Sequence, residues 1–138
     1  MNLTSLITDN IAELLVKIIE FTQSRQKILT QNINNIYRSG FVPKDLAVEE
    51  FCSLLNNAIN EHTRSRRLLF CDTKNIKFGA VGRLETQPTI DIDAKKLLEE
   101  NRNEYLELQI NKLLENSLNQ RLAAELLKQK QEITSIFE

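Results

Sequence analysis

No glycine or proline follows Pro88, so the 50 residues numbered 89–138 contain no residue that obliges a helix to break. Apolar residues recur every three or four positions through this stretch, which predicts one helix with Asp93 as its N-cap. Residues 94–137 would form a helix about 66 Å long, whereas a compact chain of this length has a diameter of about 40 Å. The helix therefore either breaks at an unmarked position or makes the molecule elongated.

The apolar residues of this last segment form a stripe with steps of four. Because four residues exceed one helical turn, the stripe winds around the helix axis, and one neighbouring helix could not cover all of it. This favours packing among several subunits, although a bent helix in a bundle would also satisfy the pattern. The stripe consists of Leu106, Ile110, Leu114, Leu118, Leu122 and Leu126, with Ile133 following.

A second long helix is predicted near the N-terminus, from about Asn10 to Arg38, with Asn10 as its N-cap. Its end is marked by Gly40, which can adopt the left-handed conformation of a helix cap. Phe41 would be the apolar partner of that cap, and Pro43 prevents the helix from continuing.

The middle of the chain predicts less regular structure. A short helix is expected from Leu46 to Asn60 with Asp45 as its N-cap. Residues 67–71 and 75–81 fit short extended pieces, with a turn near Gly79 to Gly82.

The predicted fold is mainly α, with long N- and C-terminal helices packed side by side in a coiled-coil-like manner. A short irregular or β middle segment would join them. The chain then divides into an N-terminal assembly helix within residues 1–40, a middle segment at 41–93 and a C-terminal assembly helix at 94–138.

Sequence signals for catalysis, metal binding or cofactors are weak. The single histidine, His62, lies among polar residues, and no nucleotide-binding or hydrolase motif is present. Asp91 and Asp93 could share one face of a strand and bind a cation, but a polar strand edge leading into a helix explains them better. We therefore expect no enzyme activity, no catalytic, metal-binding or cofactor-binding residues, and no small-molecule substrate.

The charge pattern also argues against nucleic acid as a partner. Formal net charge is −1, and the small cluster of Arg64, Arg66 and Arg67 lacks the broad basic face that nucleic acid requires. Pairing of these arginines with carboxylates of another subunit is the expected role. Cys52 and Cys71 have no metal-site spacing; Cys52 is expected in the core, and a disulfide between them is possible but unsupported.

Residues 25–41, RQKILTQNINNIYRSGF, resemble the N-terminal signature of bacterial flagellar axial proteins. In that family a helix with the pattern RQ…L…NIAN is followed by TPGY. Residues 38–41, RSGF, occupy the TPGY position here, and Asn34 replaces the usual alanine. The residues that match this assembly motif are Arg25, Gln26, Leu29, Asn32, Ile33, Asn35, Gly40, Phe41 and, downstream, Asp45.

Two further segments resemble the rod proteins within this family. Residues 63–68, TRSRRL, are similar to the family's TxxRH step, with Arg67 in place of histidine. The C-terminal segment is similar to the family's last helix, with Gln120 in place of tyrosine. Two alignments of this segment remain open: one matches Asp91 and Asp93 to the acidic step before the helix, and the other uses Asn101 and Tyr105.

The resemblance implies a structural subunit of the flagellar basal-body rod that self-associates in a helical assembly. Its partners would be other rod proteins, the base-of-rod adaptor and, during secretion, the flagellar export apparatus. It implies a periplasmic location in the basal body after export without a cleaved signal peptide. The residues expected to form the assembly helix are Leu114, Leu118, Leu122, Leu126 and Ile133.

The residues themselves leave a second hypothesis open, a cytosolic helical adaptor or chaperone that binds one partner through its amphipathic helices. Both hypotheses need exposed apolar stripes, because such stripes are a liability in a protein without a partner. The register of the C-terminal helix, the stoichiometry, the order of neighbours in a rod and the conformation of the free monomer do not follow from the sequence.

Overall fold

The computed structural model describes residues 3–79 and 83–137, which form helices joined by short strands and turns. The elements in chain order are α1 (Leu3–Asn34), β1 (Lys44–Asp45), α2 (Val48–Ser65), β2 (Ile76–Lys77), β3 (Glu85–Thr86), β4 (Thr89–Ile90), α3 (Ile92–Glu100) and α4 (Arg102–Phe137).

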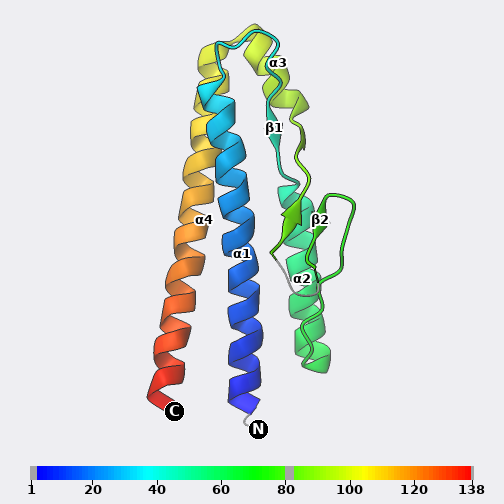
Figure 1. Ribbon diagram of the computed structural model, residues 1–138, viewed down its shortest axis with the longest axis vertical. Coiled ribbons are helices and arrows are strands. Elements are labelled where there is room, and N and C mark those ends of the chain that lie inside the picture. The colour runs from blue at the N-terminus through cyan, green and yellow to red at the C-terminus, as the bar shows by residue number, and fades with distance from the viewer. Residues whose placement is uncertain (1–2, 80–82, 138) are drawn as a thin grey trace.

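The two long helices α1 and α4 lie side by side and run antiparallel (Figure 1). The start of α1 and the end of α4 lie at one end of this hairpin, and the turn after α1 meets α3 and the start of α4 at the other end, which we call the apex. The predicted fold class is therefore confirmed: the protein is mainly α, with its long terminal helices packed together and a short middle segment that contains strands.

The middle segment packs against α1 on the side away from α4 (Figure 1). Phe21 of α1 stacks on Phe51 of α2, with ring centroids 4.0 Å apart, and Phe51 in turn lies against Phe78. The middle segment is thus not an independent apolar unit, because its buried residues share a core with α1. This core consists of Phe21, Leu46, Phe51, Leu54, Ile76, Phe78 and Leu84.

Two pairs of very short strands fix the path of the middle segment. β1 pairs antiparallel with β4, with Lys44 opposite Ile90, and so joins the chain leaving α1 to the chain entering α3. β2 pairs with β3, with Ile76 opposite Thr86. The extended piece predicted at 67–71 has no strand, β2 covers only part of the one predicted at 75–81, and residues 80–82 of the predicted turn lie outside the described residues.

The predicted start and end of the first helix were wrong. Asn10 lies inside α1 and is not an N-cap; its side-chain nitrogen lies 3.2 Å from Nδ1 of His62, at the far end of α2. The helix ends at Asn34, and a turn follows in which the Arg38 amide donates to the carbonyl of Asn35. Gly40 therefore belongs to this turn, six residues after the helix.

Asp45 is not the N-cap of α2. The helix begins at Val48 after Ala47, which makes no side-chain cap hydrogen bond, and Asp45 lies in β1. The prediction failed because an aspartate near a helix start is a capping signal only when no stronger partner claims its carboxylate. Cys52 was also misplaced: it and Cys71 are both exposed and unpaired.

The C-terminal segment breaks at Asn101, between α3 and α4. Asn101 is extended, with φ of −152°, and its side-chain oxygen accepts hydrogen bonds from the amides of Asn103 and Glu104 at 3.1 and 3.2 Å. An asparagine side chain can thus end one helix and cap the next without glycine or proline. Asp91, rather than Asp93, caps α3 by accepting from the Ala94 amide at 3.1 Å.

Candidate functional site

Three residues of the assembly motif occupy one face of α1 because their spacing of four and three residues follows the helical period. Arg25, Leu29 and Asn32 are all buried on this face, where α1 meets β1 and α4. The motif therefore faces the inside of the subunit at the apex, rather than its surface.

Arg25 forms a two-pronged ion pair with Asp45 of β1. Its Nε and Nη2 donate to the two carboxylate oxygens at 2.9 and 3.0 Å, and the side chains are 8% and 14% exposed. Lys112 of α4 donates to the same carboxylate at 3.1 Å and to Asp91 at 2.6 Å. These four residues, which we call the Asp45 network, tie α1, β1 and α4 to the N-cap of α3.

The electrostatics of the Asp45 network favour its charged forms. Burial raises the pKa of Asp45, but its hydrogen bonds to Arg25 and Lys112 and their charges outweigh burial, so the pKa lies below its usual value. Burial lowers the pKa of Lys112, while Asp91 and Asp45 raise it above its usual value overall. Nearby, burial and the charge of Asp91 raise the pKa of Tyr105 to about 12.

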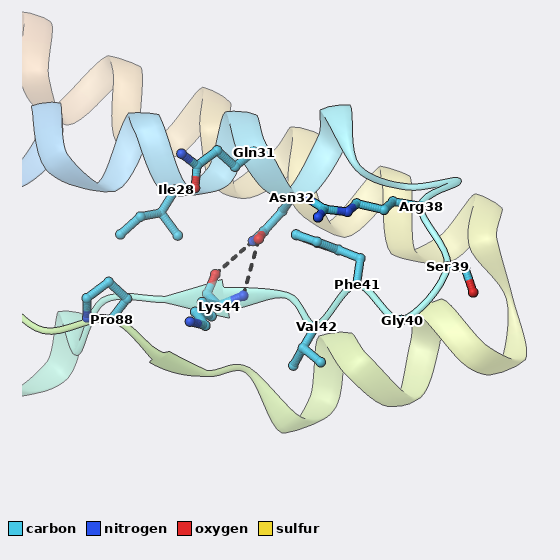
Figure 2. Close-up of a pocket in the computed structure, with 10 residues that line it drawn as sticks. All are labelled: Ile28, Gln31, Asn32, Arg38, Ser39, Gly40, Phe41, Val42, Lys44 and Pro88. Carbon is cyan, nitrogen blue, oxygen red and sulfur yellow. Dashed lines mark hydrogen bonds between the residues drawn. The ribbon is translucent and has the colours of Figure 1, made fainter.

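Asn32 takes the place of a neighbouring strand beside β1. Its Nδ2 donates to the Lys44 carbonyl at 2.7 Å, and its Oδ1 accepts from the Lys44 amide at 3.2 Å (Figure 2). The same Nδ2 donates to Oε1 of Gln109 on α4 at 3.0 Å. The amide therefore satisfies loop backbone and also bridges two helices, which explains one of the asparagines that crowd the end of α1.

Polar side chains of α4 fix its register on α1 through backbone carbonyls. The Tyr105 hydroxyl donates to the carbonyl of Asn32 at 2.8 Å, and Asn116 donates to that of Thr22 at 2.7 Å. Gln109 is fully buried between the helices, and within the described chain its Nε2 has no hydrogen-bond partner. The face of α4 that meets α1 is thus strongly polar.

The apolar stripe of α4 instead faces outward. All five residues predicted for the assembly helix are exposed, although leucine and isoleucine normally lose water on folding. Their exposed fractions are 59% for Leu114, 64% for Leu118, 58% for Leu122, 42% for Leu126 and 53% for Ile133.

The C-terminal part of this stripe borders an apolar groove between α2 and α4, with α1 as its floor. The groove encloses about 260 Å³. Leu122 and Leu126 form one wall, Leu15 and Phe21 belong to the floor, and Leu55 lies on the α2 side. The stripe and the groove therefore make one continuous apolar surface.

The remaining motif residues lie around the apex turn. Gln26 is exposed, Ile33 and Phe41 are half-buried, and Asn35 donates to the Gln31 carbonyl at 2.8 Å. Gly40 has φ of +75°, so the predicted left-handed conformation is confirmed, although it ends the turn rather than the helix. The motif meets the leucine stripe only in part: Arg25 lines the groove together with Leu122 and Leu126, whereas Gly40 and Phe41 lie at the apex turn.

Sequence reasoning missed the inner face of α4. Tyr105, Gln109, Lys112 and Asn116 carry most of the polar contacts to α1 and the apex, and none was predicted as a site residue. Their spacing of four, three and four residues was a signal, because it places them on one helix face opposite the leucines. A polar face with helical spacing is usually the solvated one, and in α4 it is the buried one.

The residues set aside as weak signals have ordinary structural roles. Asp91 is an N-cap and ion-pair partner, and the exposed Arg64 pairs with Glu61 at 2.8 Å. Within residues 3–79 and 83–137, no group of histidine, cysteine or acidic side chains is arranged to hold a metal ion. Over the same residues, no helix has the length and apolar character needed to cross a bilayer.

Replacing Gly40 with alanine should lower the free energy of unfolding by about 1 kcal/mol, because a Cβ makes the left-handed conformation costly. No atom lies within 4 Å of the position that a Cβ would take, so the cost is conformational rather than steric. Urea denaturation would measure it, and Gly40→Asn should recover part of the loss. Unchanged stability of Gly40→Ala would contradict the assignment.

Gly79 provides a matched control for valine substitutions. Its φ is +68°, so Gly79→Val and Gly40→Val carry a similar backbone strain. We predict that Gly40→Val impairs assembly of the chain more than Gly79→Val does, because Gly40 lies in the turn at the apex. Equal assembly of the two variants, measured at equal stability, would show that Gly40 has no special role.

The fold should lose stability at both extremes of pH. Because the Asp45 pKa is lowered on folding, its contribution is complete above about pH 4 and declines as the pH falls further. Because the Tyr105 pKa is raised to about 12, stability should also fall as the pH rises from about 10 to 12, and Lys112, whose pKa is raised as well, contributes to this loss. Urea denaturation across this range would measure both limbs, and Tyr105→Phe should flatten the alkaline limb.

Comparison of the chain with protein-family models, with curated proteins and with solved structures gave no match in any of the three.

Proposed function

We propose that this chain is a structural subunit of a filamentous assembly, of the class of bacterial flagellar rod proteins. Within that class it most resembles the proximal rod protein FlgB. The observation that carries the proposal is the outward-facing leucine stripe of α4. It lies on a hairpin in which the start of α1 and the end of α4 are at the same end. An exposed apolar surface of this kind marks a site that a partner covers.

The polar inner face of α4 supports an assembly role. A helix that served only the core of its own subunit would turn its leucines toward α1. Here α4 binds α1 through hydrogen bonds from Tyr105 and Asn116 and leaves Leu114, Leu118 and Leu122 available. This distribution suits a helix that packs against several neighbours at once.

The apex supports the resemblance to the axial-protein family at the level of individual residues. Arg25, Asn32 and Asp45 match the family motif, and all three take part in the contacts that fix the apex. A rigid apex would set the direction in which the middle segment leaves the helix pair. The partners would be further copies of the chain, other rod proteins and the base-of-rod adaptor, reached through the flagellar export apparatus without signal cleavage.

The direct test is the composition of purified basal bodies from the bacterium that encodes the chain. The chain should co-purify with the rod in stoichiometric amount, and a deletion strain should lack filaments and motility until the gene is restored. Absence from intact basal bodies, or full motility of the deletion strain, would contradict the proposal.

The groove between α2 and α4 favours the second hypothesis, an adaptor or chaperone. Its volume of about 260 Å³ and its apolar lining suit a few side chains of one amphipathic helix. An adaptor would form a stable one-to-one complex in the cytosol and would be absent from basal bodies. Size-exclusion chromatography of the chain with its co-purified partner separates this hypothesis from a rod subunit.

A further inference from the structure

A pocket of about 460 Å³ lies beside the apex turn, between the end of α1, β1 and the chain before β4. Its apolar lining consists of Ile28, Phe41, Val42 and Pro88, which come from both walls of the pocket (Figure 2). Its polar lining includes the amide of Asn32 and two cations, Arg38 and Lys44.

The pocket is positive and has no internal counter-charge. None of its lining residues is acidic. The side chains of Arg38 and Lys44 make no ion pair or hydrogen bond within the described parts of the chain, whereas Arg25, Lys112 and Arg64 each pair with a carboxylate. Figure 2 shows the Arg38 side chain extending from the turn toward Asn32 and Phe41.

We propose that this pocket binds an acidic peptide segment of a partner protein, one with a carboxylate side chain next to a bulky apolar one. The carboxylate would lie between Arg38 and Lys44, since a guanidinium matches carboxylate geometry and a lysine adds a mobile charge. The apolar neighbour would lie against Phe41 and Pro88. A simple inorganic anion would make no contact with this apolar lining.

The pocket would hold a peptide by its side chains rather than by backbone pairing, because Asn32 already bonds both backbone groups of Lys44 at this edge of β1. The Asn32 bonds can therefore stay in place when a peptide binds. The inference does not depend on the rod assignment, because it concerns a different face from the leucine stripe.

The test is an NMR titration of the ¹⁵N-labelled full chain with the peptide Ac-Ala-Phe-Glu-Ala-NH2. The amide signals of Gly40, Phe41 and Lys44 should shift, and added salt should weaken binding. The matched peptide with glutamine in place of glutamate should bind about tenfold or more weakly, because charge-assisted hydrogen bonds are lost. Equal binding of both peptides, or no binding at millimolar concentration, would overturn the proposal.

The variants Arg38→Gln and Lys44→Gln should each weaken binding of the glutamate peptide several-fold without altering the fold. The Asn32 contacts use only the backbone of Lys44, so they persist in the second variant. Lys27→Gln removes an exposed cation of α1 outside this pocket and should have no effect. Unchanged binding by the Arg38 and Lys44 variants would overturn the proposal.

Two further outcomes would assign the pocket to another occupant. Inorganic phosphate that shifts the same amides as strongly as the peptide would show a simple anion site. Shifts of these amides that follow protein concentration without peptide would show that a second copy fills the pocket. Either result would overturn the proposal of an acidic peptide.

Discussion

Asp45→Ala is expected to lower the free energy of unfolding by about 3–5 kcal/mol, because removing one partner of a buried ion pair leaves the other charge uncompensated. The substitution leaves the guanidinium of Arg25 buried without its carboxylate, and it removes one of two partners of Lys112. It also removes the hydrogen bond that the carboxylate accepts from the Leu46 amide. Urea denaturation of the wild type and the variant at neutral pH would measure the loss.

A matched surface pair gives the control. Glu61→Ala removes the partner of Arg64, whose side chain is 79% exposed, and should cost far less stability than Asp45→Ala. Replacing Arg25 and Asp45 together with apolar residues of similar volume should recover much of the stability, because Lys112 then keeps Asp91 as its partner and no charge is left buried unpaired. A loss at Asp45 no larger than at Glu61 would show that the Asp45 network is not a structural centre.

The contacts of the Asp45 network could not be predicted from the motif residues alone. Arg25 and Asp45 stand 20 positions apart, and their spacing says nothing of contact without knowledge of the turn between them. Asp45 was predicted as a helix cap, since local signals were the only ones that sequence offered. Its actual partners come from α1 and α4. Lys112 is 67 positions away, so only the tertiary structure reveals this contact.

The fold class followed from the sequence because long helices have a strong periodic signal. The helix boundaries did not follow, because single side chains decide where a helix ends. Asn101 begins α4 by accepting hydrogen bonds from two backbone amides, which the other described asparagines at helix ends do not do. Asn35, for example, also bonds backbone but lies just past the end of α1. Composition alone does not separate these two uses of the same residue.

The steps of four in the sequence located the leucine stripe of α4, but its inner face was not predicted. Leu114, Leu118, Leu122 and Leu126 are exposed, whereas their role in an assembly stays a prediction. The usual assumption that polar residues face water would place Gln109 and Asn116 on the solvent side, whereas both are buried. Asn116 donates to a backbone carbonyl of α1, and Gln109 accepts from the side chain of Asn32.

The double variant Leu118→Asp and Leu126→Asp should remain folded as a monomer and lose incorporation into the basal body. Both side chains are exposed in the isolated subunit, so carboxylates there stay hydrated and should cost little stability. In an assembled helix interface, each would become an unpaired buried charge at a cost of several kcal/mol. The two losses together would exceed what a subunit contact is expected to supply.

Circular dichroism and urea denaturation of the monomer, together with cross-linking to neighbouring rod proteins, would measure both parts of this expectation. Leu69→Asp is the matched control, because Leu69 is 52% exposed and lies in the middle segment away from α4. If the double variant unfolds as a monomer, the stripe has a role in the subunit's own core and the adaptor hypothesis gains support. If it assembles as well as the Leu69 variant, α4 does not face its neighbours through these leucines, and the proposed rod function loses its main support.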